Sequence, residues 1–144
     1  MTTPAPLAWI GEACALMLAD DASMDAIAGW LGVEPDPADG DRLRAGPGCL
    51  PGMAHVSVIG ADGVPDSISA WYAPDAGPTL DQAAAVLGSP REIARAVDGP
   101  FRVAFPTASS RTATCLLAGS TWGPPRGGSR IVEFVLRRDP LAAA

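Results

Sequence analysis

The chain has 144 residues, of which 48% are hydrophobic, and its formal net charge is −6. That length matches a single domain, residues 1–144, large enough to bury about two thirds of the surface of its unfolded chain, so folding requires neither a disulfide nor a metal. The sequence contains no Lys, which is typical of GC-biased codon usage of the actinobacterial kind and excludes no function by itself.

The start of the chain lacks the features of a secretory signal. No Lys or Arg precedes Leu7, and the apolar run that follows ends at Asp20. No apolar run reaches the roughly 18 residues of a membrane span. We therefore expect a cytoplasmic protein that makes no membrane contact. Its three cysteines are odd in number and widely spaced, so we expect reduced thiols: Cys14, Cys49 and Cys115.

The first elements in chain order are two helices and a loop. Residues 6–19 place apolar side chains at helical spacing with one charge among them, which predicts a mostly buried helix. Ser23 is positioned to cap a second helix that ends at Leu31, and Gly32 can supply its left-handed stop. Residues 33–53 are rich in Asp, Gly and Pro without an apolar period, which predicts a surface loop.

A β-hairpin is predicted next. Residues 54–59 alternate apolar and polar side chains, and residues 64–72 form a second extended run. The turn between them, residues 60–63, begins and ends with Gly, as hairpin turns often do. The two runs should therefore pair as antiparallel strands.

A second set of helices and strands follows the hairpin. Thr79 and Gln82 have capping-box spacing at the start of a helix that ends at Gly88. Residues 89–97 begin with another capping box and a Pro at the first helical position, which predicts a further short helix. Three strands should complete the chain: 101–105, 112–119 and 130–138.

The sequence contains an approximate internal repeat. Residues 23–32 align with residues 79–88 in cap, Asp, apolar stripe and terminal Leu-Gly, at an offset of 56 positions. The similarity has two explanations. One is an internal duplication, and the other is that any capped amphipathic helix that ends in Leu-Gly would align as well. We expect an α+β fold in which tandem helix-plus-antiparallel-hairpin units, residues 7–73 and 78–139, form one antiparallel sheet of about five strands with helices packed on one face.

The second copy carries a family resemblance. The segment from Thr79 through Leu87-Gly88-Ser89-Pro90-Arg91, followed by the strand 101–105, resembles the helix–LGxP–strand signature of the small outer-membrane lipoprotein and β-lactamase-inhibitor-protein superfamily. The resemblance implies a concave sheet face that recognises another protein, with helices behind it. This chain differs from those families in having no lipobox Cys near its start and no paired Cys within the repeats. Immunity proteins for polymorphic toxins offer a further analogy at the level of fold.

Few residues suit catalysis or metal binding. His55 is the only His, and in an enzyme it could act with Asp66 or Glu133 in proton transfer. Cys49 and His55 have no further Cys or His at zinc-like spacing, and the acids of residues 34–41 do not have the spacing of a calcium loop. We therefore expect no metal, no cofactor and no dedicated catalytic group.

Charge and aromatic residues indicate a binding surface. Residues 1–90 hold twelve acids and two Arg, whereas residues 91–144 hold four acids and eight Arg, so the later Arg residues should pair with the first half or with an acidic partner. Trp9 and Trp30 should be core residues. The candidate binding residues are the strand-end aromatics and the residues of the Gly/Pro-rich turns: Trp71, Tyr72, Arg111, Trp122, Arg126 and Arg130.

These observations favour a protein-binding or inhibitor module, of immunity type, whose partner is another protein such as a toxin or an enzyme. The alternative is a small-molecule pocket protein, such as a cyclase or isomerase of natural-product biosynthesis, with an enclosed apolar cavity. The charge difference between the halves would also permit a homodimer. Nucleic acid is not expected as a partner, because the chain is acidic and its predicted sheet lacks interleaved aromatics for base stacking.

Overall fold

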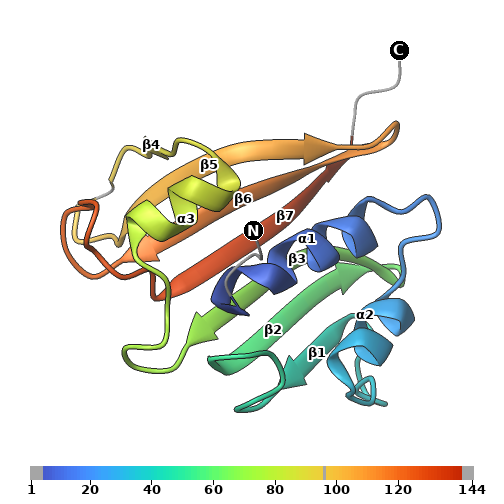
Figure 1. The fold of residues 1–144 in the computed structure, drawn as a ribbon. Helices are drawn as coiled ribbons and strands as arrows, with labels where there is room; N and C mark the ends of the chain where they lie inside the picture. The colour runs from blue at the N-terminus through green and yellow to red at the C-terminus, as the bar shows by residue number, and fades with distance from the viewer. Residues whose placement is uncertain (1–4, 96, 141–144) are drawn as a thin grey trace.

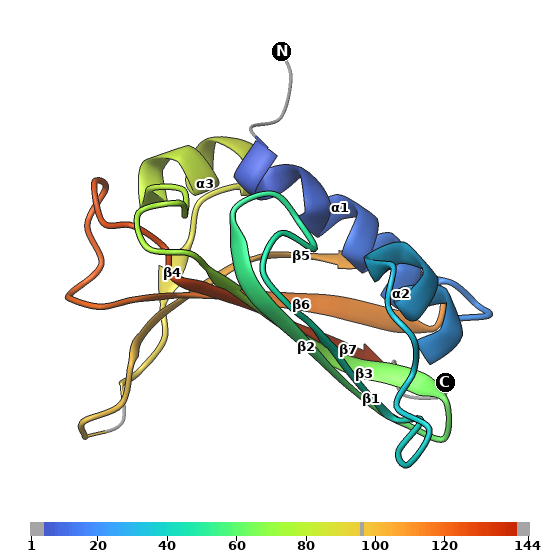
Figure 2. The same cartoon turned by 90° about the horizontal axis from the view of Figure 1, so that it is seen from below.

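Seven antiparallel strands form one sheet, and three helices lie on one of its faces (Figures 1 and 2). The computed structural model describes residues 5–95 and 97–140. In chain order the elements are α1 (Ala5–Leu18), α2 (Met24–Leu31), β1 (Arg42–Ala45), β2 (Met53–Ala61), β3 (Val64–Tyr72), α3 (Leu80–Leu87), β4 (Arg91–Glu92), β5 (Phe101–Ser109), β6 (Ala113–Thr121) and β7 (Glu133–Pro140).

The strand order is β1-β2-β3-β7-β6-β5-β4, so the last strand in the chain lies at the centre of the sheet. One half consists of α2 followed by β1, β2 and β3, and the other consists of α3 followed by β4, β5, β6 and β7. The final strands of the two halves, β3 and β7, pair in an antiparallel fashion with Ser69 opposite Val135. The expected α+β fold with one antiparallel sheet is confirmed, but the sheet has seven strands rather than about five.

The first additional strand is β1, which lies inside the segment predicted to be a loop. It pairs with β2 from Arg42 opposite Ile59 to Ala45 opposite Val56, and its residues are alternately exposed and buried. Four residues of alternation between Gly- and Pro-rich neighbours are too short to be distinguished from a loop by periodicity.

The second additional strand replaces the helix predicted over residues 89–97, within which residue 96 lies outside the described part. Arg91 and Glu92 pair with Ala104 and Val103 on β5. That helix prediction was wrong, because the edge of β5 provides backbone hydrogen-bond partners, whereas a helix of two turns is marginal without tertiary packing.

The ends of α2 and α3 agree with their sequence signals. The Ser23 hydroxyl accepts a hydrogen bond from the Ala26 amide at 3.1 Å, and Gly32 is left-handed with φ 71°. Thr79 and Gln82 form the reciprocal capping box, with distances of 3.2 and 2.9 Å. Each helix therefore begins where its cap satisfies free backbone amides.

The hydrophobic core lies between the helices and the sheet. Phe134 on β7 is its aromatic centre, with ring centroids 6.3 Å from Trp9, 6.1 Å from Tyr72 and 5.8 Å from Phe105. A Cβ at Gly119 on β6 would lie 3.3 Å from the rings of both Phe105 and Phe134, so the absence of a side chain there allows these rings to pack onto the strand. This filled layer fixes α1 over β6 and β7.

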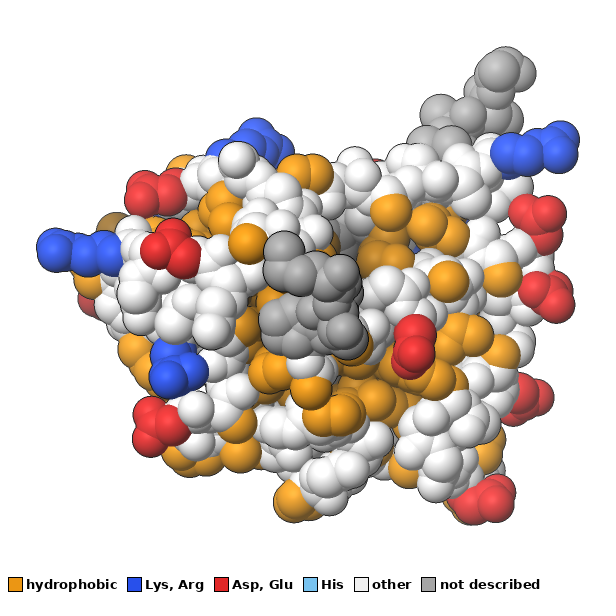
Figure 3. Space-filling view, in the orientation of Figure 1, with side chains coloured by type: hydrophobic (Ala, Val, Ile, Leu, Met, Phe, Trp, Pro, Cys, Tyr) orange, Lys and Arg blue, Asp and Glu red, His pale blue; other side chains and the backbone are white. Residues whose placement is uncertain are grey.

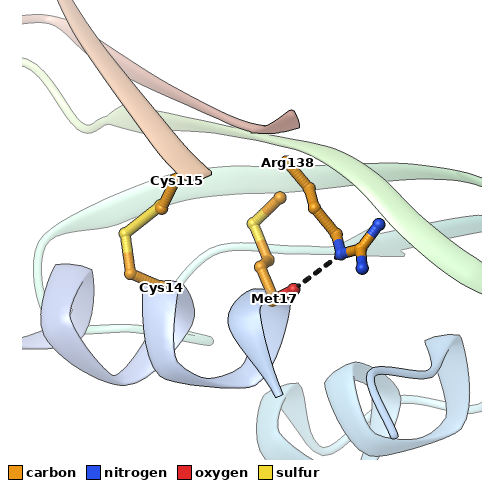
Figure 4. Close-up of a disulfide and its surroundings, with 4 residues drawn as sticks. All are labelled: Cys14, Met17, Cys115 and Arg138. Carbon is orange, nitrogen blue, oxygen red and sulfur yellow. Dashed lines mark hydrogen bonds between the residues drawn. A yellow bond between two sulfur atoms is a disulfide. The ribbon is translucent and has the colours of Figure 1, made fainter. Parts of the chain in front are cut away.

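A disulfide joins α1 to the sheet (Figure 4). Cys14 on α1 is bonded to Cys115 on β6, with 5.8 Å between their Cα atoms and 101 positions between them in sequence. The expectation of reduced thiols is therefore wrong for this pair and stands only for Cys49, which is free. Spacing along the chain could not reveal the bond, because only the packing of α1 across β6 brings the two residues together. Near the end of α1, the Arg138 side chain donates a hydrogen bond to the Met17 carbonyl at 2.9 Å.

Candidate protein-binding surface

One face of the sheet is covered by α1, α2 and α3, and no helix of the described residues lies on the other (Figure 2). We call this second side the open face. Side chains alternate along each strand, so on β3 Ile68 and Ala70 are buried toward the helices, whereas Ser69 and Trp71 are half-buried on the open face. The pairing registers carry this alternation across the sheet and define which residues share the open face.

The open face is rich in arginine although the chain is acidic. By strand alternation it carries two acids, Glu133 and Asp139, against five arginines: Arg42, Arg44, Arg91, Arg102 and Arg137. The helix side, in contrast, shows many Asp and Glu side chains along its margin in Figure 3. The net negative charge of the chain is therefore not shared by the open face.

The arginines of the second half do not pair with acids of the first half. Among residues 5–95 and 97–140, the one ion pair joins Arg42 to Asp39 at 3.3 Å, within the first half. The expectation of ion pairing with acids of the first half is therefore wrong for the described residues, and pairing with an acidic partner stays a prediction. Arg130 and Arg138 donate instead to backbone carbonyls of Gly77 and Met17, whereas the side chains of Arg91, Arg102 and Arg137 form no ion pair with the described residues.

A concavity of about 320 Å³ lies on the open face over β4, β5, β6 and β7. Its floor contains Ala104, Ala118 and Val135, which lie opposite one another on β5, β6 and β7. The floor row ends at Arg91, which pairs with Ala104 on β4. Arg102 and Arg137 line the concavity from the neighbouring rows. The arrangement places three cationic groups around small apolar side chains.

A polar and aromatic row runs beside this concavity. The register places His55, Trp71, Glu133, Ser120 and Arg102 opposite one another on β2, β3, β7, β6 and β5. The His55 and Trp71 rings are stacked, with centroids 6.1 Å apart. Ser120 donates a long hydrogen bond of 3.4 Å to the Glu133 carboxylate. The row therefore places two stacked aromatic rings beside a carboxyl group and a guanidinium group.

Glu133 is the most perturbed carboxyl group on this face. Only 8% of the residue is exposed, and this burial raises its pKa above the ordinary value for Glu. Arg102, the Ser120 hydrogen bond and His55 act in the opposite direction, in that order of importance. The effect of burial on the pKa of Glu133 therefore exceeds the combined effect of its favourable contacts.

The three residues considered for catalysis do not converge. His55 and Glu133 share a row, but β3 and Trp71 lie between them, which separates them by two strand spacings or about 10 Å. Asp66 is exposed and falls where the register shifts between Ile59 and Gly60. A proton donor and acceptor at hydrogen-bond distance are therefore not assembled from these residues.

The predicted binding residues are distributed over separate places. Trp122 is 81% exposed in the β6–β7 connection and lines a second concavity of about 260 Å³ together with Arg130. Arg130 also donates a hydrogen bond to the Gly77 carbonyl at 2.7 Å. Arg126 is exposed in the same connection, whereas Arg111 is exposed in the turn between β5 and β6.

Tyr72 does not lie on the surface as predicted. It is 7% exposed, donates a hydrogen bond to the Pro6 carbonyl and accepts one from the Trp9 indole at 3.3 Å. Burial raises its pKa, and the Trp9 hydrogen bond opposes that rise. Adjacent residues of a strand point to opposite faces, so Trp71 and Tyr72 cannot both be anchors on one face.

Several residues that shape the concavity of about 320 Å³ could not be identified from the sequence. Arg91 was assigned to a helix, and Ala104, Leu116, Ala118 and Val135 were read only as strand residues. The available signal was the alternation within β5 and β7, where Arg102 shares a face with Ala104 and Arg137 with Val135. Without the strand order, nothing indicated that these positions are neighbours.

A scan against models of known protein families, a search of curated proteins and a search of solved structures each found no match to this chain.

Proposed function

We propose that this chain is a protein-binding module, of the inhibitor or immunity type, that recognises another protein through the open face of its sheet. The observation that carries the proposal is a helix-free, seven-stranded face that combines Trp71 with five arginines. Trp and Arg are the residues most enriched at the energetic centres of protein interfaces. The resemblance to inhibitor proteins that bind through a sheet face agrees with this proposal.

The size of the open face supports the proposal. Seven strands spaced by about 4.8 Å span about 29 Å, and a nine-residue strand such as β2 spans about 30 Å. Because β1 and β4 are short, the projected area is on the order of 700 Å². A standard interface buries about 800 Å² on each partner, so this face could form most of one.

The small-molecule alternative has less support. It predicted an enclosed apolar cavity, whereas the layer between α1 and the sheet is occupied by packed side chains such as Trp9, Met17 and Phe134. The 320 Å³ concavity lies on the outer face and is walled by arginines. This geometry suits the side chains of a partner better than a sequestered reaction.

The compartment in which the protein works stays a prediction. None of the helices in the described part of the chain combines the length and hydrophobicity needed to cross a membrane. A cytoplasmic location was expected, but the Cys14–Cys115 disulfide favours an oxidising compartment, because cytosolic thiols are normally kept reduced. Determining the redox state of this pair in freshly lysed source cells would decide between them.

Site-specific photo-crosslinking tests the proposal. A photoreactive amino acid in place of Ser69, at the centre of the open face, should form an adduct with one polypeptide in extracts of the source cells. The matched control replaces Val86, which is 41% exposed on α3. Adducts formed from position 86 and not from position 69 would contradict the proposal.

The polypeptide identified by crosslinking can then be purified and measured by calorimetry. We expect a 1:1 complex that Trp71→Ala weakens by about tenfold or more, since buried interface aromatics are typical hot spots. Trp122→Ala and Arg126→Ala test whether the β6–β7 connection extends the interface, as the sequence predicted. Unchanged affinity in all three variants would contradict a role for these anchors.

A further inference from the structure

We propose that the arginine-walled concavity over β4–β7 binds an acidic segment of the partner protein, with an apolar side chain of that segment on the concavity floor. The inference rests on the proposed function, because it names the chemistry of the partner that the open face recognises. The concavity is one part of the open face, so the acidic-segment proposal and the protein-binding proposal can be tested separately.

Charge complementarity is the first reason. Arg91, Arg102 and Arg137 come from three different strands and line the same concavity. Within the described ranges, no carboxylate lies within ion-pair distance of any of them. A guanidinium group can hold a carboxylate through two parallel hydrogen bonds, so three such groups can recognise closely spaced Asp and Glu residues.

The two acids of the open face, Glu133 and Asp139, form no ion pair with these arginines within the described residues. Glu133 lies in the Arg102 row, but Ser120 stands between the two positions in the register. Burial raises the pKa of Glu133, and the charge of Arg102 is the leading influence in the opposite direction. Arg137 lies in the row on the other side of the floor from the Glu133 row, and Arg91 lies at the end of the floor row.

The shape of the floor is the second reason. Ala104 and Ala118 have short side chains, whereas the flanking rows carry Arg102 on one side and Leu116 with Arg137 on the other. A volume of about 320 Å³ is at the lower end of the range of ligand pockets, about 300–1,000 Å³. It therefore suits one or two side chains of an extended segment.

An acidic protein segment fits this site better than a nucleic acid does. Binding of single-stranded nucleic acid usually combines basic groups with aromatic side chains on which successive bases stack. The aromatic residue of the open-face row, Trp71, lies on β3, outside the concavity. Phe105 also lines the concavity, but it is 3% exposed and its ring packs against Phe134 in the core. The floor instead presents aliphatic groups, which match Leu- or Val-like side chains.

Fluorescence polarisation with defined probes tests the inference. The first probe is a fluorescein-labelled peptide, Asp-Glu-Leu-Asp-Glu-Leu-Asp-Glu, and the second has Asn and Gln in place of its acids. A labelled single-stranded oligonucleotide of similar charge is the third. We expect the acidic peptide to bind, the amide peptide to bind at least tenfold more weakly, and the oligonucleotide to bind more weakly than the acidic peptide. Equal binding of the two peptides would overturn the inference, and tighter binding of the oligonucleotide would replace it with a nucleic-acid site.

Charge-reversal variants locate the binding. Arg102→Glu and Arg137→Glu should each weaken the acidic peptide by about tenfold, or about 1.4 kcal/mol. Arg111→Glu is the matched control, since it makes the same charge change in the β5–β6 turn, outside the concavity. If Arg111→Glu has the same effect as the other two variants, the peptide is attracted by the overall charge of the protein and the inference is wrong.

Circular dichroism of the variants and crosslinking from Ser69 serve as controls for the peptide-binding result. Arg102 and Arg137 are exposed, so the variants should keep the circular dichroism spectrum of the parent chain; if one does not, the corresponding Arg→Gln variant is used and should lose several-fold in affinity. Crosslinking from Ser69 reads out the proposed function separately. An adduct at Ser69 together with no peptide binding would overturn the acidic segment while leaving a protein-binding face.

Discussion

The two faces of the sheet are built from the same strands, yet they differ in almost every property. The helix face holds Phe134, Leu136 and Ile68, which are fully buried, and α1 is joined to it by a disulfide. The open face holds Trp71 and Val135, which are half-buried, together with five arginines. The difference indicates that the burial that stabilises the fold is concentrated on the side that faces the helices.

The period-2 alternation of strands makes this division sharp. Phe134 and Val135 are neighbours in the chain, but one belongs to the aromatic core and the other to the floor of the concavity. Paired substitutions at adjacent positions can therefore separate stability from binding.

Phe134→Ala should destabilise the fold far more than Val135→Ala. Removing a fully buried aromatic side chain typically costs about 3–5 kcal/mol, whereas shortening a half-buried Val should cost about 1 kcal/mol. The free energy of unfolding, measured in urea for both variants, gives the comparison. Similar losses at the two positions would mean that the open face is also buried, for example in an oligomer.

Breaking the Cys14–Cys115 disulfide should cost about 2–4 kcal/mol, because a loop that spans 101 positions would no longer be closed in the unfolded chain. Urea unfolding with and without a reductant measures this difference. Cys49→Ala is the control, and it should retain the response to the reductant. A curve that does not shift on reduction would show that the two thiols are not bonded in the folded protein.

Thr79→Ala should cost about 1 kcal/mol, because it removes one half of the capping box at the start of α3. Affinity for the acidic peptide should not change, since α3 lies on the helix face. Thr79→Ser keeps the hydroxyl and should restore most of the stability. A loss of peptide affinity in Thr79→Ala would indicate that the two faces are coupled.

Glu133→Gln should slightly stabilise the fold at neutral pH. The folded-state pKa of Glu133 is raised, so folding favours the protonated form; this contribution is present below the unfolded pKa and is lost as the pH rises through the folded pKa. The amide removes the desolvated charge and can still accept the Ser120 hydrogen bond. Its advantage in melting temperature should therefore shrink in acid, and an advantage that grows in acid would contradict the assignment.

Much of the fold could be predicted from local signals. The caps at Ser23 and Thr79 predicted the starts of α2 and α3, and extended runs between turn residues predicted β2, β3, β5, β6 and β7 to within a few residues. The predictions of a loop at β1 and of a helix at β4 were wrong for the same reason. Both are short edge strands that form only because a partner strand lies beside them. Local propensity cannot report such pairing.

The candidate site was less predictable than the fold. Trp71 and Tyr72 look equivalent in sequence, and only the register decides which of them faces outward. The concavity needs β4, β5, β6 and β7 side by side, in an order that no motif encodes. The disulfide had to be missed for the same reason, since its two cysteines approach only after α1 has packed on β6.

The central position of β7 has a consequence for how the protein is made. The ribosome synthesises the chain from its N-terminus, so β3 and β6 both emerge before the strand that pairs with each of them. Until β7 arrives, the edges of β3 and β6 are unprotected in addition to those of β1 and β4, and such edges are templates for unwanted pairing with other chains. The complete sheet can form only after β7 has been synthesised. Before then, a chaperone that covers exposed strand edges would have its largest effect.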